Sequence, residues 1–512
     1  MSDESPSERL RLTCVEATER LADALAVAGF KESLSRKAMW VGPIAFGAAS
    51  ADGDQLCTVL ELTVPAEYPF EPPLVRPLPR DAAEAWACKP LTGYYEVSEA
   101  WHLERSGRMC LYEPADHLDL PWADPPSLLR HVARWLYADH AGWPDDPPAL
   151  DLDRYFTPSG QVFLFDLPRL RDRVGEVVSL TRRHATIRHG SPVLPPKGRK
   201  RRPVTRGKND ALVLDLGTLR EPVRNLDQVK DAAGDATPLI EQELKRGIRE
   251  LVILYNRGGE QGVLALTLTG NPSPQVEAHL AAPTDVDAVA LRSHPRRKEL
   301  ADRRVAIVGV GAIGSVLADL LHRSGVGKLH LIDPDLVLPG NLVRHLCGDD
   351  HIGRPKAEAV RAALHSSRPG STTLITVDLH RLRTLAATLE LFEDADVVAD
   401  ASADSTATRL VRAAADAGAG RAVSVAVLAD GYAVRVDRYP TPASGPMATA
   451  DLPPRTPGVY EAGCSSPVST TPPAAVWEAA SVAARHVIAI LLSEPGSAGE
   501  ERVLRARRDT TA

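Results

Sequence analysis

The sequence has few cysteines, and none of them forms a C-x-x-C pair. Six are spread over the 512 residues: Cys14, Cys57, Cys88, Cys110, Cys347 and Cys464. Zinc sites and dithiol redox motifs use closely spaced cysteine pairs, so neither is indicated. Sparse, unpaired cysteines are typical of a reducing compartment, and we expect free thiols in the cytoplasm.

The sequence also lacks an excess of basic charge and a long apolar run. The formal net charge is -7, which argues against nucleic acid as a partner of the whole chain. The longest late apolar run, HVIAILL (486–492), is far shorter than the ~20 residues that span a membrane. The N-terminus, MSDESPSERLRL, is acidic and polar, unlike a secretory signal. We therefore expect a cytoplasmic protein with no membrane partner.

The length predicts several domains, because one domain usually takes roughly 100–200 residues. Composition and pattern divide the chain into 1–155, 156–295, 296–500 and a short tail, 501–512. The basic segment KGRKRRPVTRGK (197–208) is a possible nucleic acid contact, but in a chain of net negative charge we favour a solvated linker.

The three blocks differ in their periodicity. In the first, helical spacing near the N-terminus precedes a strand pattern, CTVLELTVP, and a second helical pattern, PSLLRHVARWLYADH, which predicts an α+β domain. The second contains the strand patterns ALVLDLG, ELVILYN and GVLALTLT and is expected to be a small α/β domain without assigned chemistry. The third alternates strand and helix patterns, which predicts a mostly parallel sheet with helices on both faces.

A glycine-rich turn follows the first strand of the third block. The sequence VAIVGVGAIGS places Gly309, Gly311 and Gly314 between this strand and a helix, where backbone N–H groups and the helix N-terminus favour phosphate. Asp333 follows the second strand, where an acid hydrogen-bonds a ribose hydroxyl. These residues predict a nucleotide site but leave NAD and ATP open.

Three further residues favour ATP. Asn341, Arg344 and Lys356 follow the second strand and place cations where a triphosphate would need them, whereas hydride transfer has no need of them. The run LIDPDLVLPGNLVRHLCGDDHIGRPKAEAV resembles the ThiF-type adenylyltransferase family, which includes the ubiquitin-activating enzymes. The resemblance covers about 296–490 and implies a Rossmann-like adenylation domain.

The resemblance implies roles for single residues. Asp333 would hold the ribose, Asp335 would belong to the same nucleotide site, and Asn341, Arg344 and Lys356 would hold the ATP phosphates. Residue 345 is His where the family has Gln.

The family also has an acid that holds Mg²⁺. In DVVADASADSTATR this acid is Asp404 counted back from Arg409 and Asp400 counted from the strand, and we prefer Asp404. Relatives dimerise through this domain, so a homodimer is expected, and Arg296 or Arg297 stands where some members lend an arginine to their partner.

Two cysteines are candidates for carrying an acyl group. Cys464 lies in the Gly-, Ser- and Pro-rich stretch YEAGCSSPVSTTPPAAVW, and in ubiquitin-activating relatives a cysteine downstream of the adenylation core takes the acyl group as a thioester. The alternative is an incidental loop cysteine. Cys347 lies inside the nucleotide motif and is expected to be a packing residue.

The first block also resembles a known family. EYPFEPPLVRP, WHLERSGRMCLYEP, LPWADPPSLLRHVARWL and GWPDDPP follow one another as in ubiquitin-conjugating enzymes, which maps the active cysteine to Cys110. That family has His-Pro-Asn before the cysteine, whereas this chain has His102 and no Pro-Asn. We expect His102 or a backbone N–H to stabilise the oxyanion instead; a turn-capping His102 is the alternative, and His117 and His140 are weaker candidates.

A conjugating-like and an activating-like domain in one chain resemble the bacterial fusion proteins of CBASS antiphage systems. The resemblance implies adenylation of a protein C-terminus, capture by Cys464, transfer to Cys110 and attack by a target amine, with the C-terminus of a CD-NTase as substrate. A dedicated bacterial ubiquitin-like protein or a sulfur-carrier protein is the alternative substrate. An NAD(P)-dependent oxidoreductase and a nonenzymatic nucleotide-binding scaffold are the remaining alternatives.

Overall fold

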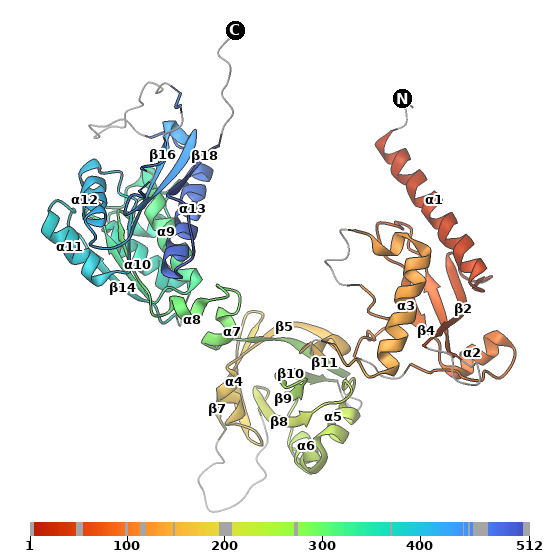
Figure 1. The fold of residues 1–512 in the computed structure, drawn as a ribbon. Helices are drawn as coiled ribbons and strands as arrows, with labels where there is room; N and C mark the ends of the chain where they lie inside the picture. The colour runs from red at the N-terminus through yellow and green to blue at the C-terminus, as the bar shows by residue number, and fades with distance from the viewer. Residues whose placement is uncertain are drawn as a thin grey trace, which may run out of the picture. The chain divides into compact units, whose positions relative to one another are not determined.

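The computed structural model describes residues 5–47, 55–97, 101–112, 119–146, 149–193, 207–270, 275–368, 371–443, 445–448, 451–453 and 469–504. The chain divides into two compact units, Met1–Thr284 and Asp285–Ala512 (Figure 1). Our boundary at 155/156 falls inside the first unit and that at 295/296 inside the second, so the division into three domains stays a prediction.

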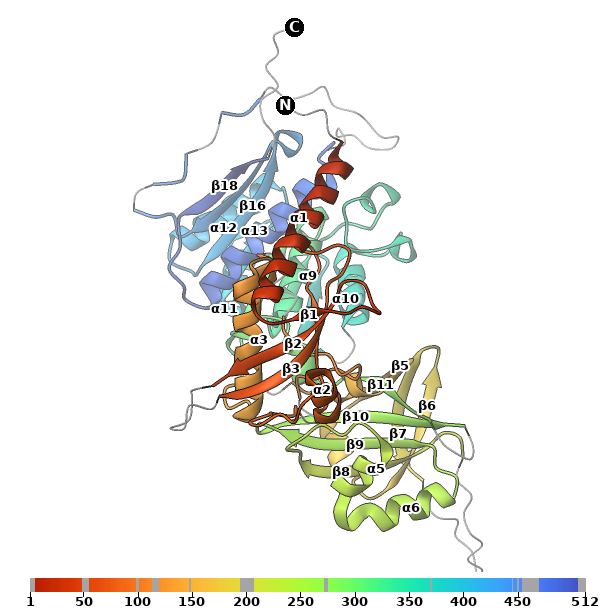
Figure 2. The same cartoon turned by 90° about the vertical axis from the view of Figure 1, so that its right-hand side faces the viewer.

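The N-terminal part of the first unit is an antiparallel sheet of order β1-β2-β3-β4 with helices beside it (Figure 2). Its elements are α1 (Pro6–Val27), β1 (Lys31–Glu32), β2 (Met39–Phe46), β3 (Leu56–Thr63), β4 (Leu74–Pro77), α2 (Arg80–Ala87), η2 (Pro121–Ala123) and α3 (Pro125–His140). Helix α3 begins at an Asp124 cap and buries Leu128, Val132 and Trp135, which share one helical face. The α+β prediction is confirmed.

The rest of the first unit is a closed seven-stranded barrel of order β10-β11-β5-β7-β6-β8-β9. Its elements are η3 (Leu152–Tyr155), β5 (Thr157–Phe165), α4 (Leu167–Arg171), β6 (Val177–Arg183), β7 (Thr186–Pro192), β8 (Asp210–Thr218), α5 (Leu226–Ala233), η4 (Gly234–Ala236), α6 (Thr237–Lys245), β9 (Glu250–Arg257), β10 (Glu260–Thr269) and β11 (Gln275–Pro283). The three strand patterns of the sequence are β8, β9 and β10. The expected small α/β domain is thus a barrel accompanied by short helices.

The second unit is a seven-stranded sheet of order β14-β13-β12-β15-β16-β17-β18. The elements of its sheet and covering helices are α7 (Val286–Ala290), α8 (Arg297–Leu300), β12 (Arg304–Val308), α9 (Ala312–Ser324), β13 (Lys328–Ile332), α10 (Lys356–Ser367), β14 (Leu374–Asp378), α11 (Leu385–Asp394), β15 (Val397–Asp400), α12 (Ser405–Asp416), β16 (Ala422–Leu428), β17 (Ala433–Tyr439), α13 (Pro473–Leu491) and β18 (Gly499–Val503). Strands β12 to β16 pair in parallel, and β17 and β18 extend the sheet antiparallel. The predicted strand and helix alternation is confirmed.

Both faces of this sheet are covered. Val305 and Ile307 of β12 belong to a core shared with α9, α10 and α13, whereas Ala306 and Val308 belong to a core shared with α11 and α12. Alternate residues of a strand point to opposite faces, so the parallel strands read as continuous apolar runs. Among the described residues α13 is the one helix long and apolar enough to cross a membrane, and most of it is buried in this core.

Candidate active site

The glycine-rich turn joins β12 to α9 and brings the backbone close to the loop after β15. Gly309 has φ +81°, and a Cβ atom there would lie 2.3 Å from the Cα of Ser402. A Cβ on Gly314 would lie 1.9 Å from the carbonyl oxygen of Gly309, whereas one on Gly311 would meet nothing within 4 Å. Gly309 and Gly314 are therefore required by packing, and Gly311 leaves open space at the N-terminus of α9.

Asp333 holds this turn from the end of β13. Its carboxylate accepts hydrogen bonds from the backbone N–H of Val310 (2.9 Å) and of Asp335 (2.9 Å). The side chain is 4% exposed, and burial raises its pKa, although both N–H bonds oppose that shift. Each carboxylate oxygen keeps a second lone pair, so Asp333 can still accept a hydroxyl of a ribose.

A pocket lies beside Gly309 at the carboxyl edge of the parallel strands. Its lining residues are Val308, Gly309, Ile332, Asp333, Pro334, Asp335, His380, Arg381, Leu382, Ser402, Ala403, Asp404 and Ala407. This edge of an open α/β sheet is where ligands bind. The pocket therefore contains Gly309, Asp333, Asp335 and Asp404 of the residues that the sequence indicated.

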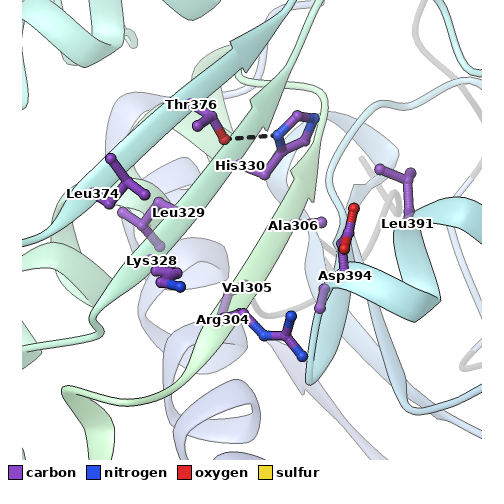
Figure 3. A pocket seen from close by; sticks show the side chains of 11 residues that line it. Arg304, Val305, Ala306, Lys328, Leu329, His330, Leu374, Thr376, Leu391 and Asp394 are labelled. Atoms are coloured by element: carbon purple, nitrogen blue, oxygen red, sulfur yellow. Dashed lines mark hydrogen bonds between the residues drawn. The ribbon is translucent and has the colours of Figure 1, made fainter.

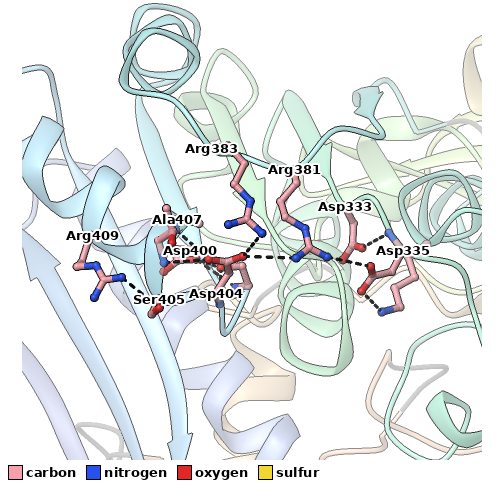
Figure 4. A network of polar contacts seen from close by, with 12 residues as sticks. Asp333, Asp335, Arg381, Arg383, Asp400, Asp404, Ser405, Ala407 and Arg409 are labelled. Atoms are coloured by element: carbon pink, nitrogen blue, oxygen red, sulfur yellow. Dashed lines mark hydrogen bonds and ion pairs between the residues drawn. The ribbon is translucent and has the colours of Figure 1, made fainter. Parts of the chain in front are cut away.

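Arg381 and Arg383 face the acids around this pocket (Figure 4), and Lys356 also pairs with one of these acids. Lys356 Nζ lies 3.1 Å from Oδ2 of Asp335, and Arg381 reaches both Asp335 (3.6 Å) and Asp404 (3.8 Å). Arg383 lies 3.8 Å from Asp404. The sequence indicated Lys356 but missed both arginines, whose signal was their alternation in HRLRT directly after the third parallel strand.

Asp404 and Asp400 have different surroundings. Asp404 caps α12, accepting from the N–H groups of Thr406 and Ala407, and these bonds hold its pKa below the ordinary value. Asp400 is 2% exposed and accepts hydrogen bonds from the hydroxyls of Ser402, Thr408 and Ser424. Only Asp404 lines the pocket, so it is the acid with an oxygen available to a cation.

Asn341 and Arg344 do not line the pocket. The Asn341 amide oxygen accepts from the N–H of Leu338 (2.9 Å), and Arg344 donates to the carbonyl oxygens of Ser469 (3.1 Å) and Thr471 (3.3 Å). Their predicted contact with ATP phosphates stays a prediction. In the described segments Arg344 instead fastens the chain that leads into α13.

His345 bonds the glycine-rich turn in place of a glutamine. Burial lowers its pKa, so the ring is neutral, with Nε2 donating to the carbonyl oxygen of Val310 (2.9 Å) and Nδ1 accepting from the N–H of Cys347 (3.2 Å). Cys347 is 3% exposed, and burial raises its pKa to about 12. Its thiol is therefore inert, as expected of a packing residue.

The two candidate partner arginines are engaged within their own unit. Arg296 pairs with Glu299 (2.6 Å) and Glu494 (3.1 Å), and Arg297 pairs with Asp287 (3.3 Å). Their predicted role across a dimer stays a prediction.

A second cavity in this unit lies on the face of the sheet, away from the glycine-rich turn (Figure 3). It is lined by the first residues of β12, β13 and β14 and by Leu391 and Asp394 of α11, and inside it His330 hydrogen-bonds Thr376 (2.8 Å). The starts of the strands lie opposite the carboxyl edge, so this cavity is not the nucleotide site.

The residues at the carboxyl edge fit ATP and Mg²⁺ in their chemistry. The N-terminus of α9 and the cations Lys356, Arg381 and Arg383 suit phosphates, and Asp333 suits a ribose. Among the described residues no three His, Cys, Asp or Glu side chains gather as a metal site. Mg²⁺ usually takes one or two carboxylates plus substrate phosphates and water, so Asp404 alone is a sufficient protein ligand.

Cys110 lies in a second chemical cluster, in the first unit. Its thiol interacts with the side chains of His102 and Arg154, and both lower its pKa. Nε2 of His102 lies 3.0 Å from Oδ2 of Asp146 as an ion pair, and the imidazole packs against the ring of Trp143 with centroids 4.1 Å apart. The sequence analysis named Cys110 and His102 but missed Asp146 and Arg154. Asp146 belongs to the PDD turn, and Arg154 gave no local signal.

The cluster lowers the pKa of Cys110. The hydrogen bond from His102 is the largest cause; burial opposes it, and the hydrogen bond and charge of Arg154 add to it. Burial alone would lower the pKa of His102, but its bonds to Cys110 and Asp146 raise it above the ordinary value. A lowered thiol pKa beside a raised imidazole pKa is the signature of a reactive cysteine.

The barrel holds the chain that leads to Cys110. The indole N–H of Trp101 donates to the carbonyl oxygen of Arg220 (2.9 Å), and Arg224 donates to the carbonyl oxygen of Leu103 (3.1 Å). Arg257 lies over the Trp101 ring at 4.0 Å and pairs with Asp146. Both sides of His102 are therefore fixed by barrel residues.

The remaining candidates lie elsewhere. Cys464 and His117 fall outside the described residues. The His140 ring packs edge to face on Tyr95, with centroids 5.2 Å apart, which is a packing role.

The second unit is similar in sequence to a known protein family. Residues 286–508 match the ThiF family. The ATP-dependent ubiquitin transferase-like protein Cap2 of Pseudomonas aeruginosa is 40% identical over 87 residues, 16% of this chain and 16% of that protein. Ubiquitin-like modifier-activating enzyme 5 of Drosophila ananassae is 43% identical over 72 residues, 14% of this chain and 18% of that protein. The matches span about a sixth of the length of these curated relatives.

Among solved structures, MccB of E. coli is similar over 41% of this chain and 66% of its own, at 20% identity and a TM-score of 0.33. That likeness is too weak to add to the argument for function.

Proposed function

We propose, on the premise that residues 286–508 are a ThiF family domain, that this chain adenylates a protein C-terminus with ATP, captures it as a thioester and conjugates it to a target amine. The observation that carries the proposal is that one chain contains two sites suited to successive steps of this reaction. One is a pocket lined by Asp333, Asp404 and Arg381, with Lys356 and Arg383 paired to its acids, and the other is the Cys110 thiol with its lowered pKa.

The first step is adenylation. A carboxylate oxygen of the substrate attacks the α-phosphorus of ATP, and pyrophosphate leaves. Lys356, Arg381 and Arg383 neutralise charge on the phosphates by exchanging their carboxylate partners for phosphate oxygens. The two arginine side chains are about half exposed, and such ion pairs contribute little to folding, so the exchange costs little. Asp333 orients the ribose, and Mg²⁺ held by Asp404 would supply further charge neutralisation.

The second step moves the acyl group to sulfur. We propose that Cys464 attacks the acyl adenylate and releases AMP, and that the thiolate of Cys110 then attacks the Cys464 thioester and releases the Cys464 thiolate. An amine finally attacks the Cys110 thioester and releases the Cys110 thiolate. The hydrogen bonds of His102 and Arg154 to the Cys110 sulfur support its role as acceptor.

The substrate we propose is the C-terminus of a CD-NTase in a CBASS antiphage system. The likeness to the Pseudomonas relative, an ATP-dependent ubiquitin transferase-like protein, favours this class of reaction. A dedicated ubiquitin-like protein is the second candidate, favoured by the likeness to the Drosophila ubiquitin-like modifier-activating enzyme. A homodimer and a cytoplasmic location complete the proposal.

The test uses the full chain with ATP and each candidate substrate. We expect pyrophosphate release that depends on the substrate C-terminus, which an oxidoreductase or a scaffold would not give. Cys464→Ala is expected to keep adenylate formation and lose the reducible thioester, and Cys110→Ala to keep the Cys464 thioester and lose conjugation. Cys88→Ala is the matched control for an exposed thiol. Unchanged conjugation by the Cys110→Ala variant would overturn the relay.

A further inference from the structure

Arg154 stands between the Cys110 thiol and open space. Two cavities, of about 670 Å³ and about 520 Å³, share Arg154 and Arg105 as lining residues. The Arg154 side chain interacts with the Cys110 thiol, and its Nη1 lies 3.1 Å from Oδ2 of Asp151, the residue that precedes η3. Arg154 therefore lines both cavities and also interacts with the Cys110 thiol.

Asp146 stands on the other side of the imidazole. Nε2 of His102 lies 3.0 Å from Oδ2 of Asp146, and this contact favours the protonated ring. Asp146 is itself held by Arg257, which also donates to the carbonyl oxygen of Ala149 (2.9 Å). The imidazole therefore interacts with both the thiol and a carboxylate that Arg257 holds.

We propose that Cys110 acts as a thiolate held by His102 and Arg154, that Arg154 is a catalytic residue whose guanidinium stabilises the oxyanion of the acyl transfer, and that Asp146 is the positioning residue of His102. The proposal deepens the proposed function, on which its biological meaning rests. It supplies the donor that the missing Pro-Asn pair leaves open.

The acyl transfer follows from this arrangement. The Cys110 thiolate attacks the carbonyl carbon of the incoming thioester, and the π electrons move to the oxygen, which Arg154 stabilises as an oxyanion. The intermediate collapses, and the donor sulfur leaves as a thiolate that takes a proton from solvent. Once Cys110 is acylated its negative charge is gone, so His102 releases its proton to solvent more readily. The neutral imidazole then accepts the proton of the attacking amine as the Cys110 thiolate leaves.

Other charged groups around the pair set its pH response. Asp139 interacts with His102 and accepts from the Trp143 indole N–H (3.0 Å), Asp151 pairs with Arg154, and Arg257 pairs with Asp146. The acids favour the imidazolium and the arginines favour the thiolate. Both sets of charges therefore favour the ion pair of thiolate and imidazolium.

The test compares two reagents on the full chain. Peptide mass mapping measures the modification of Cys110, and the exposed Cys88 is the internal reference. Iodoacetamide reports the thiolate without forming an oxyanion, whereas p-nitrophenyl acetate acylates the sulfur through an oxyanion. We expect Cys110 alkylation to reach its half-maximal rate at lower pH than Cys88, and Arg154→Ala, His102→Asn and Asp146→Asn to move that midpoint upward.

The decisive variant is Arg154→Ala at a pH where Cys110 is fully ionised. Alkylation is expected to be unchanged there, while acylation slows on the order of 100-fold, the effect of losing one oxyanion donor. Arg154→Lys keeps the charge and is expected to recover part of the acylation rate, and Arg105→Ala, which lines the same cavities, is expected to change neither rate. Equal slowing of alkylation and acylation would overturn the proposal. A wild-type acylation rate in an Arg154→Ala variant with a native circular dichroism spectrum would overturn it as well.

Neither reagent requires ATP or a protein substrate. Failure of the proposed function would leave these rates as expected while conjugation is absent. If the inference fails, conjugation stays intact and the substitution of Arg154 leaves the acylation rate of Cys110 unchanged.

Discussion

Nη1 of Arg381 lies 3.8 Å from Oδ2 of Asp404, and the same guanidinium lies 3.6 Å from Oδ1 of Asp335. One arginine thus bridges acids that follow two different strands, across the mouth of the nucleotide pocket. Its side chain is 49% exposed, so it is free to exchange these acids for a phosphate.

Arg381→Ala is expected to raise the KM for ATP. A hydrogen bond to a charged group contributes about 1.5–3 kcal/mol, which corresponds to a rise of roughly tenfold or more. The measurement is ATP–pyrophosphate exchange at varied ATP. Arg409→Ala is the control, because Arg409 contacts Ser405 and lies apart from the bridging arginines (Figure 4). Equal effects of the two substitutions would argue against a phosphate contact.

Asp404→Asn is expected to reduce pyrophosphate exchange by more than about tenfold while leaving folding almost unchanged. Asparagine caps a helix about as well as aspartate, so the substitution removes the charge available to Mg²⁺ and retains the cap of α12. Asp124→Asn, which alters the cap of α3 in the other unit, is the matched control. Normal exchange by Asp404→Asn would show that another acid holds the metal.

Gly309→Ala is expected to destabilise the second unit, and Gly311→Ala is not. Alanine at φ +81° costs on the order of 1–3 kcal/mol, and its Cβ would also collide with the backbone at Ser402. Gly311 has φ -71° and open space around it. Calorimetric unfolding of both full-length variants measures the difference, and similar melting temperatures would contradict the geometry.

His322 is expected to make the second unit sensitive to acid. Burial lowers the pKa of this histidine to about 4, whereas the unfolded chain has an ordinary pKa of 6.5. The unfolded state therefore binds the proton more tightly, and stability is constant above about pH 6.5 and falls by on the order of 3 kcal/mol as the pH drops towards 4.

The measurement is calorimetric unfolding of the full chain between pH 4 and pH 8. His322→Leu is expected to flatten the profile, since Ser371 keeps a hydrogen bond with Thr373 (3.2 Å). The matched control is His380→Asn, because this side chain is 92% exposed. An acid-sensitive profile that persists in His322→Leu would assign the effect to another group.

The parallel sheet was predictable because strands such as β12 and β15 are apolar runs buried on both faces, and a helix with its own periodicity follows each of these two. Gly309 and Asp333 were predictable for the same reason, since a strand end and the next turn are local in sequence. The barrel was not predictable. Its closure depends on the parallel pairing of β5 with β11, which joins Val162 to Leu280 across more than a hundred residues.

The residues that the sequence analysis missed share one property. Arg381 and Arg383 reach Asp404 only because β14 and β15 flank the central pair of strands, and Arg154 reaches Cys110 only because the chain turns back before β5. Their contacts come from topology. The alternation of Arg381 and Arg383 is visible in the sequence, but residue type and spacing do not reveal which other segment supplies the partner.

Arg224 and Arg257 contact the residues on either side of His102, and this limits how the first block can be exchanged between proteins. A conjugating-like block transplanted by recombination without its own barrel would keep its cysteine but lose the contacts that fix the neighbouring histidine. The thiol site therefore depends on the barrel. The barrel is part of that site and could not be exchanged for an unrelated domain without loss of these contacts.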